Sequence, residues 1–270
     1  HGWEPLTYLC FSRLYHEARD RRGFLESARL LLEGGADAKA GYIESAHVGR
    51  PVWESVLYAA SGLARDAEMT RLLLQHGADP NDEETPYHAP ESYDNACVSV
   101  LIESGKMNVE SLSTLLLRKL DWHDFQGAKM ALDAGADPNF PSRWNVCALH
   151  QALRRDNALT VVELLLERGA DPFTVSSAEH GDSFWIAARR GRGDVLELLE
   201  RVGHRRSWEP AEQVLADCAF GRQPASIPAE ARPLISSFAG QIIAWFAGND
   251  NAKGLECLVR LGLPVNAISR

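Results

Sequence analysis

Leu164-Leu165-Leu166-Glu167-Arg168-Gly169-Ala170-Asp171 is the stretch that decides the fold, because its pattern recurs along the 270-residue chain. An apolar run followed by Gly-Ala-Asp occurs four times, and the glycines of these copies are Gly35, Gly77, Gly135 and Gly169. Weaker copies of the run end at Gly105, Gly203 and Gly262. Self-similarity of this kind indicates an array of stacked repeats rather than a single globular core.

One copy, from Cys147 to Asp171, shows what each unit must look like. Residues 147–153 form a short helix of small and apolar residues, and a second helix follows over 161–166, with apolar side chains at helical spacing. Gly169 supplies the left-handed conformation that ends a helix without a Cβ clash. Pro172 then prevents the helix from resuming. Such a short helix pair cannot bury both apolar faces alone, so it must stack on neighbouring units.

The unit begins with Cys147-Ala148-Leu149-His150, and an earlier unit begins with Thr85-Pro86-Tyr87-His88. These openings and the Gly-Ala-Asp endings resemble the ankyrin repeat, whose period is about 33 residues. The resemblance implies an all-α solenoid of stacked helix-turn-helix units with short hairpin loops. Residues 2–203 would hold about six ankyrin repeats, and 204–270 would form degenerate ankyrin-like helical repeats.

Two segments of the first repeat exceed the family's length, at 11–23 and at 39–53. Insertions of this size are either functional or simply tolerated. The pattern is also cut at both ends of the chain, so we expect a piece of a longer protein or ends that are covered in an oligomer.

Composition excludes several classes of function. The net charge of −9 argues against a general binder of nucleic acids or anionic membranes. The most apolar stretch, Leu234–Ala247, is too short to cross a bilayer, so no membrane insertion is expected. The five cysteines form no CxxC pair, which favours free thiols and a reducing, cytoplasmic location.

Three short motifs suggest chemistry, but each fits a structural role better. Cys147 and His150 could form half of a metal site, although His150 occupies the hydrogen-bonding histidine position of the ankyrin opening. Residues 121–124 place carboxylates around His123, at a polar break between helices. Ser183 lacks the strand-to-helix turn of a serine nucleophile. We therefore predict no enzyme activity, no catalytic residue, no cofactor and no metal.

Aromatic and arginine side chains cluster in the later repeats, and both are enriched in binding hot spots. Trp122, Trp144 and Trp185 fall at or beside positions that border the concave groove in the resembled family. The predicted partner-binding residues are Trp122, His123, Arg143, Trp144, Arg154, Arg155, His180, Trp185, Arg189 and Arg190. Exposed arginines in this groove would favour another protein with an acidic patch.

Three functions fit these observations. The first is a non-catalytic scaffold that binds a partner protein through the concave groove. The second is an inhibitor or neutraliser that blocks a partner enzyme. The third is a small-ligand or enzymatic site built by the insertions at 11–23 and 39–53, which a deep enclosed pocket would favour.

Overall fold

The computed structural model describes residues 2–45 and 50–266, and these are mostly helical. The chain divides into two compact units, His1–Phe140 and Pro141–Arg270. The boundary between the two compact units, at residue 140, is not the predicted boundary between regular and degenerate repeats at residue 203, which stays a prediction.

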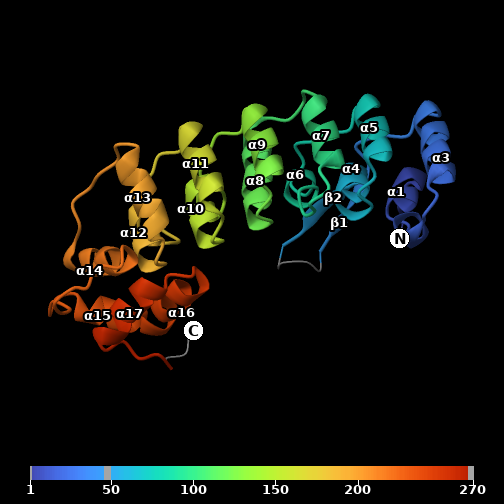
Figure 1. Cartoon of the computed structure of the whole chain (residues 1–270). Coiled ribbons are helices and arrows are strands. Elements are labelled where there is room, and N and C mark those ends of the chain that lie inside the picture. Colours follow the sequence, from blue (N-terminus) through green and yellow to red (C-terminus); the bar gives the residue numbers. More distant parts are fainter. Residues whose placement is uncertain (1, 46–49, 267–270) are drawn as a thin grey trace. The chain divides into compact units, whose positions relative to one another are not determined.

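The first unit contains helix pairs, one short sheet and a π-helical turn (Figure 1). Its elements are α1 (Pro5–Cys10), α2 (Arg13–Glu17), α3 (Arg22–Glu33), β1 (Gly41–Glu44), β2 (Val52–Ser55), α4 (Val56–Tyr58), the π-helical turn η1 (Ala59–Leu63), α5 (Ala67–Gln75), α6 (Thr85–His88), α7 (Ala96–Glu103), α8 (Val109–Asp121) and α9 (Phe125–Asp133). The second helices of successive pairs, α3, α5, α7 and α9, lie side by side. Buried apolar residues of α1, α3, α4, α5 and α7 form one core cluster, and α8 packs against α6 and α9.

Both insertions of the first repeat are ordered in the residues described. The 39–53 segment contributes to an antiparallel ribbon in which Ile43 pairs with Trp53. This ribbon adds a small sheet to the predicted helical array. Gly41 permits it, because a Cβ there would lie 2.9 Å from the Trp53 ring. The 11–23 segment forms α2, whose Tyr15 is fully buried.

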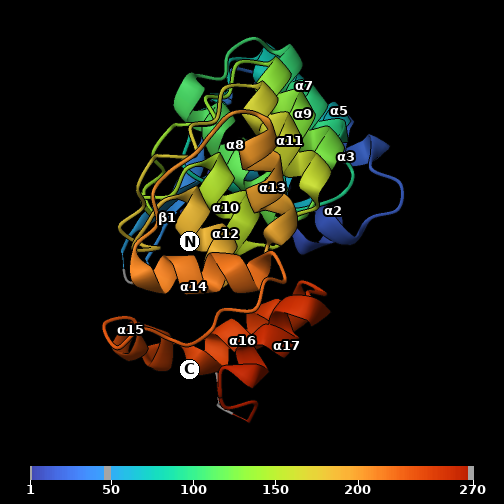
Figure 2. The same ribbon diagram turned by 60° about the vertical axis from the view of Figure 1, so that its left-hand side comes forward.

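The second unit begins with two regular helix pairs. These are α10 (Ala148–Arg154) with α11 (Leu159–Glu167) and α12 (Ser183–Arg189) with α13 (Gly193–Arg201). The remaining helices are α14 (Pro210–Ala219), α15 (Arg232–Ser237), α16 (Ala239–Gly248) and α17 (Ala252–Arg260). Within this unit α14 runs across the ends of α12 and α13, and α16 and α17 form a pair beyond it (Figure 2).

The glycines that define the sequence pattern end their helices as predicted. The φ angles of Gly35, Gly77, Gly135 and Gly169 are 95°, 100°, 103° and 85°. The three weaker copies behave alike, with positive φ at Gly105, Gly203 and Gly262. Each glycine follows the last helical turn, where a left-handed residue lets free backbone N–H groups return to the helix's final carbonyls.

Candidate functional site

Two of the predicted contact residues, Trp122 and His123, belong to the first unit. Trp122 ends α8 and packs edge-on against Tyr93, with ring centroids 5.6 Å apart. His123 is exposed and has a left-handed backbone, with φ of 54°. The neighbouring carboxylates turn to other partners: Asp121 pairs with Arg118, and Asp124 lies 3.0 Å from the buried Lys119 Nζ. These groups hold helix ends together and do not converge on His123.

Cys147 and His150 open the first helix of the second unit. The Nδ1 atom of His150 accepts a hydrogen bond from the Cys147 backbone N–H at 3.3 Å, and its Nε2 donates to the Thr174 carbonyl at 2.9 Å. Burial lowers the pKa of His150, which keeps the ring neutral for this double role. The pair therefore joins one hairpin to the next, which is the turn role that the sequence favoured.

The tips of two consecutive hairpins form an exposed surface on the second unit. We define this hairpin surface as residues 142–146 and 173–181. The Ser176 hydroxyl donates to the Asn145 carbonyl at 2.7 Å, and Asn145 also bonds Ser177, so the two tips are fixed to each other. Trp144 is 41% exposed there, with the Arg143 guanidinium 4.5 Å from its ring. Val175 on the neighbouring tip is more exposed still.

Arg154, Arg189 and Arg190 are paired with carboxylates of the second unit. Arg154 Nε lies 2.8 Å from Glu179 Oε1, and Arg189 binds the other oxygen of the same carboxylate. Arg190 donates two hydrogen bonds to the Asp156 carboxylate, of 2.9 and 2.6 Å. Arg189 and Arg190 are only 5% and 7% exposed.

The expectation that Arg189 and Arg190 form an exposed basic row is therefore wrong. Trp245 of α16 explains the difference, because its ring centroid lies 5.3 Å from Arg189 and 4.9 Å from Arg190. Trp185, also predicted to border the groove, is buried. Arg155 and His180 are exposed, and Arg154 is half-buried.

The residues that neutralise these arginines are not among the predicted contact residues. Glu179 and Asp156 are the carboxylate partners, and Asn249 adds a hydrogen bond of 2.9 Å to Asp156. Glu179 precedes His180, one of the predicted contact residues, but nothing in the local sequence pattern links Glu179 to Arg189. Asn249 and Trp245 come from the irregular C-terminal region, so their positions depend on tertiary packing.

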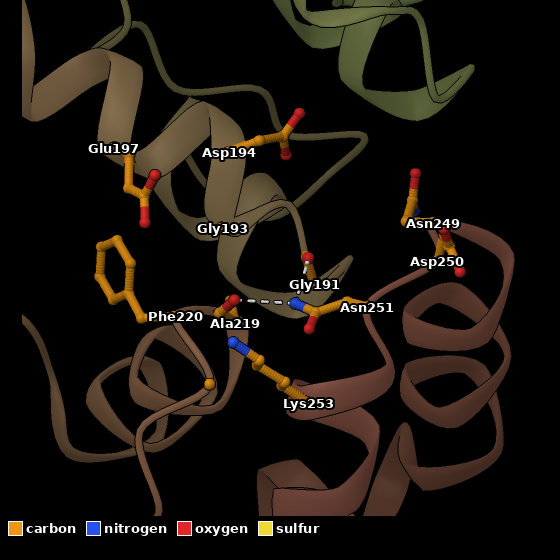
Figure 3. Close-up of a pocket in the computed structure, with 11 residues that line it drawn as sticks. Gly191, Gly193, Asp194, Glu197, Ala219, Phe220, Asn249, Asp250, Asn251 and Lys253 are labelled. Atoms are coloured by element: carbon orange, nitrogen blue, oxygen red, sulfur yellow. Dashed lines mark hydrogen bonds between the residues drawn. The ribbon is translucent and has the colours of Figure 1, made fainter.

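Two of the cavities in the described part of the second unit lie beside α12 or α13, and a larger one, of about 470 Å³, is lined by residues of 225–239 and 260–264. The first, of about 290 Å³, brings together three predicted residues, His180, Trp185 and Arg189. The second, of about 310 Å³, lies where the turns before α13 and α17 meet the end of α14 (Figure 3).

The cavity of Figure 3 is built around a structural joint. The Asn251 amide donates to the carbonyls of Gly191 and Ala219, both at 2.7 Å. Gly193 allows the close approach, because a Cβ there would lie 2.2 Å from the Ala219 oxygen. Asp194 on the wall is already paired with Arg192 at 2.8 Å. The hydrogen bonds of Asn251 thus join the turn before α17 to the turn before α13 and to the end of α14.

Within residues 2–45 and 50–266, no three His, Cys, Asp or Glu side chains are grouped so that they could hold a metal ion. No helix in the same ranges is both long and apolar enough to cross a bilayer.

Comparison with known proteins agrees with this architecture. The family model described as ankyrin repeat matches residues 146–177, which span α10, α11 and most of the second hairpin. The ankyrin repeat domain of Bcl-3, described as a member of the IkappaB family, superposes with a TM-score of 0.59 at 20% identity, covering 77% of this chain and 90% of that one. The chain has the ankyrin-repeat fold. The human ASB11 ankyrin repeat domain gives a TM-score of 0.53 at 20% identity, covering 76% and 86%.

Among curated proteins, no sequence match was found. Ankyrin-repeat domains are typically protein-interaction modules and usually non-catalytic.

Proposed function

We propose that this ankyrin-repeat chain is a non-catalytic scaffold that binds another protein through the hairpin surface and the adjoining first helices α10 and α12. The exposed Trp144 carries this proposal. A large aromatic ring at a fixed loop tip, with an arginine stacked on it, has the composition of a binding hot spot. The fixed tips need little ordering on binding, which lowers the entropic cost of association.

The partner's contact region is acidic in this proposal. Arg143 and Arg155 are exposed, so their guanidinium groups lie where carboxylates of a partner can reach them. Arg189 and Arg190 take no direct part, because their charges are used internally. Charge reversal by Arg155→Glu should slow association and reduce its dependence on salt.

A second surface supports the inhibitor alternative. The ribbon in the 39–53 insertion presents the cross-strand pair Ile43 and Trp53, which are 63% and 44% exposed. An apolar pair on a protruding ribbon could occupy a partner enzyme's cleft. The ribbon belongs to the first unit, so the two surfaces can be tested separately.

The location that we propose is a reducing intracellular compartment. All five cysteines are free and buried. Burial raises the pKa of the Cys10 thiol to about 12, with the nearby Asp66 adding to the effect, so this thiol is not a reactive one.

The test uses two tryptophans of nearly equal exposure. Partners captured from cell extract by the wild-type chain are identified by mass spectrometry and then titrated against Trp144→Ala and Trp53→Ala. The proposal expects at least a tenfold loss of affinity for Trp144→Ala, about 1.4 kcal/mol, with little change for Trp53→Ala. The reverse result would transfer the function to the ribbon, and two unaffected variants would refute both surfaces.

A further inference from the structure

The cavity of about 470 Å³ lies between α15, the start of α16 and the segment that follows α17. Its volume falls within the range of roughly 300–1,000 Å³ that is typical of small-ligand sites. Two of its apolar side chains, Ile235 and Leu263, are almost fully buried, and the half-buried Ile227 and Leu261 continue the same lining. An apolar group that enters the cavity is therefore removed from water.

The charges of the cavity lining are positive. They come from Arg232 and Arg260, and no Asp or Glu within the described ranges belongs to the lining. Arg260 is paired with Glu256, one turn earlier in α17, but these side chains are 62% and 60% exposed. An exposed ion pair of this kind contributes little to stability, so it holds Arg260 only weakly.

Arg232 is the cation that is available to a ligand. It begins α15, its side chain is exposed, and it has no carboxylate partner among the residues that the structure describes. Its Nε donates a hydrogen bond of 3.2 Å to the carbonyl of Ile227, which also lines the cavity. This bond fixes the guanidinium beside the cavity and leaves its two Nη groups for a ligand. A planar guanidinium fork of this kind matches the paired oxygens of a carboxylate or a phosphate.

Two exposed hydroxyl groups add hydrogen-bond donors to the same lining. Ser226 directly precedes Ile227, and Ser236 lies four residues after Arg232 in α15. Residues four apart in a helix lie on the same face, so the Ser236 hydroxyl and the guanidinium of Arg232 are neighbours. Both types of donor favour an oxyanion over a cation at this part of the cavity.

The end of α17 sets the direction in which an anion would lie. A helix C-terminus carries partial negative charge, which disfavours an anion next to it. The last carbonyls of α17 are satisfied within the chain, because Leu258 and Val259 accept from the N–H groups of Leu263 and Gly262 at 3.1 and 2.9 Å. The anionic group is therefore favoured on the Arg232 side, and an apolar group on the Leu263 side.

We propose that this cavity binds a small amphipathic anion, with its carboxylate or phosphate group held by Arg232 and a short alkyl chain packed on Ile235 and Leu263. The cavity is lined by residues 225–239 and 260–264, none of which belongs to the hairpin surface. The proposal therefore does not depend on the proposed function, and either can fail without the other.

The experiment uses the full chain and four probes: hexanoate, hexyl phosphate, the uncharged hexanamide, and acetate. Binding is followed by NMR, through the methyl signals of Ile227, Ile235 and Leu263. We expect hexanoate to bind at least about tenfold more tightly than hexanamide, which lacks the charge, and than acetate, which lacks the alkyl chain. The tighter of hexanoate and hexyl phosphate identifies the head group that the site prefers.

Variants at two exposed positions keep the test independent of folding. Arg232→Gln should weaken hexanoate at least tenfold, whereas Arg205→Gln, at an exposed arginine outside the lining, should bind as wild type. Ser236→Glu should abolish binding, because the new carboxylate competes for Arg232, and Ser236→Gln should retain it. The melting temperatures should be almost unchanged, because the substituted side chains are exposed.

Three results would overturn the proposal. The first is equal binding of hexanoate and hexanamide, and the second is the absence of binding by both anionic probes with alkyl chains. The third is an Arg232→Gln variant that binds hexanoate as tightly as the Arg205→Gln control.

Discussion

At the residue scale, Gly169 shows why the repeats end where they do. It follows α11 with φ of 85°, and a Cβ added there would meet no neighbouring atom within 4 Å. Any cost of substitution therefore comes from the backbone conformation. We expect Gly169→Ala to lower the free energy of unfolding by about 1 kcal/mol.

Gly23 gives the matched control for this prediction. It lies in the first turn of α3, also has open space around a Cβ, and lacks a positive φ. Gly23→Ala should be neutral or slightly stabilising, because alanine loses less backbone entropy in a helix. Urea unfolding of both variants decides the matter, and equal effects would show that the left-handed geometry has no energetic role.

His88 in the first unit is predicted to make folding pH-dependent. Burial alone would lower its pKa, but hydrogen bonds of 2.9 Å to Glu84 and Glu91 outweigh burial and raise the pKa to about 9. The unfolded value is about 6.5. A raised pKa in the folded state means that the charged ring stabilises the protein fully below pH 6.5. This stabilisation is lost as the pH rises through 9.

The variant His88→Gln tests this sign. Its loss of stability relative to wild type should be larger at pH 6 than at pH 9.5, by about 1–3 kcal/mol. Chemical unfolding at the two pH values measures the difference, with the exposed His76→Gln as control. A loss of stability that is the same at both pH values would mean that the imidazolium does not form with these carboxylates.

At the element scale, α2 shows that the 11–23 insertion is part of the core. The Tyr15 hydroxyl donates to Asp66 Oδ2 at 3.1 Å, and the other oxygen of Asp66 caps α5. Tyr15→Phe should reduce the free energy of unfolding by about 1–2 kcal/mol, because a hydrogen bond to a partly buried carboxylate is removed. Tyr8→Phe, at a half-exposed ring, should have no effect in the same thermal or chemical melts. An insertion that serves binding alone would leave both variants as stable as wild type.

The joint at Asn251 is predicted to hold the irregular end of the second unit together. Its side-chain oxygen accepts from the Gly254 N–H at 2.8 Å and caps α17, while its amide donates to two carbonyls. Asn251→Asp keeps the cap but places a carboxylate against both carbonyl oxygens. We expect a destabilisation of about 2–3 kcal/mol. Amide hydrogen exchange in α16 and α17 should then be faster than in the wild type. An Asn251→Asp variant as stable as the wild type would show that Asn251 contributes only as the N-cap of α17.

The regular elements could be predicted from sequence because their signals are local. A leucine run followed by Gly169 specifies a helix and its end within a single unit. The ribbon was missed because residues 39–53 had no counterpart in the repeat pattern. The burial of Arg189 and Arg190 was missed because it depends on Trp245, more than fifty residues away and in a region without a clear repeat. The exposure of Trp144 could be predicted because the side chain of a residue at a hairpin tip stays exposed regardless of how the C-terminal helices pack.

At the scale of the whole molecule, the ankyrin-repeat array offers two exposed tryptophans in different settings. Trp53 lies on the ribbon of the first unit, and Trp144 lies on the hairpin surface of the second. The net charge of −9 repels an acidic partner over most of the surface, so such a partner can be attracted only where positively charged side chains are exposed. Arg143 gives this property to the hairpin surface.

Hydrogen exchange on the complex tests the central claim most directly. Peptides of the chain are compared by mass spectrometry with and without the partner that the wild-type protein captures. The account predicts slower exchange over 142–146 and 173–181, with no change over 41–44 and 52–55. Protection confined to the ribbon segments, or none on the hairpin tips, would contradict it.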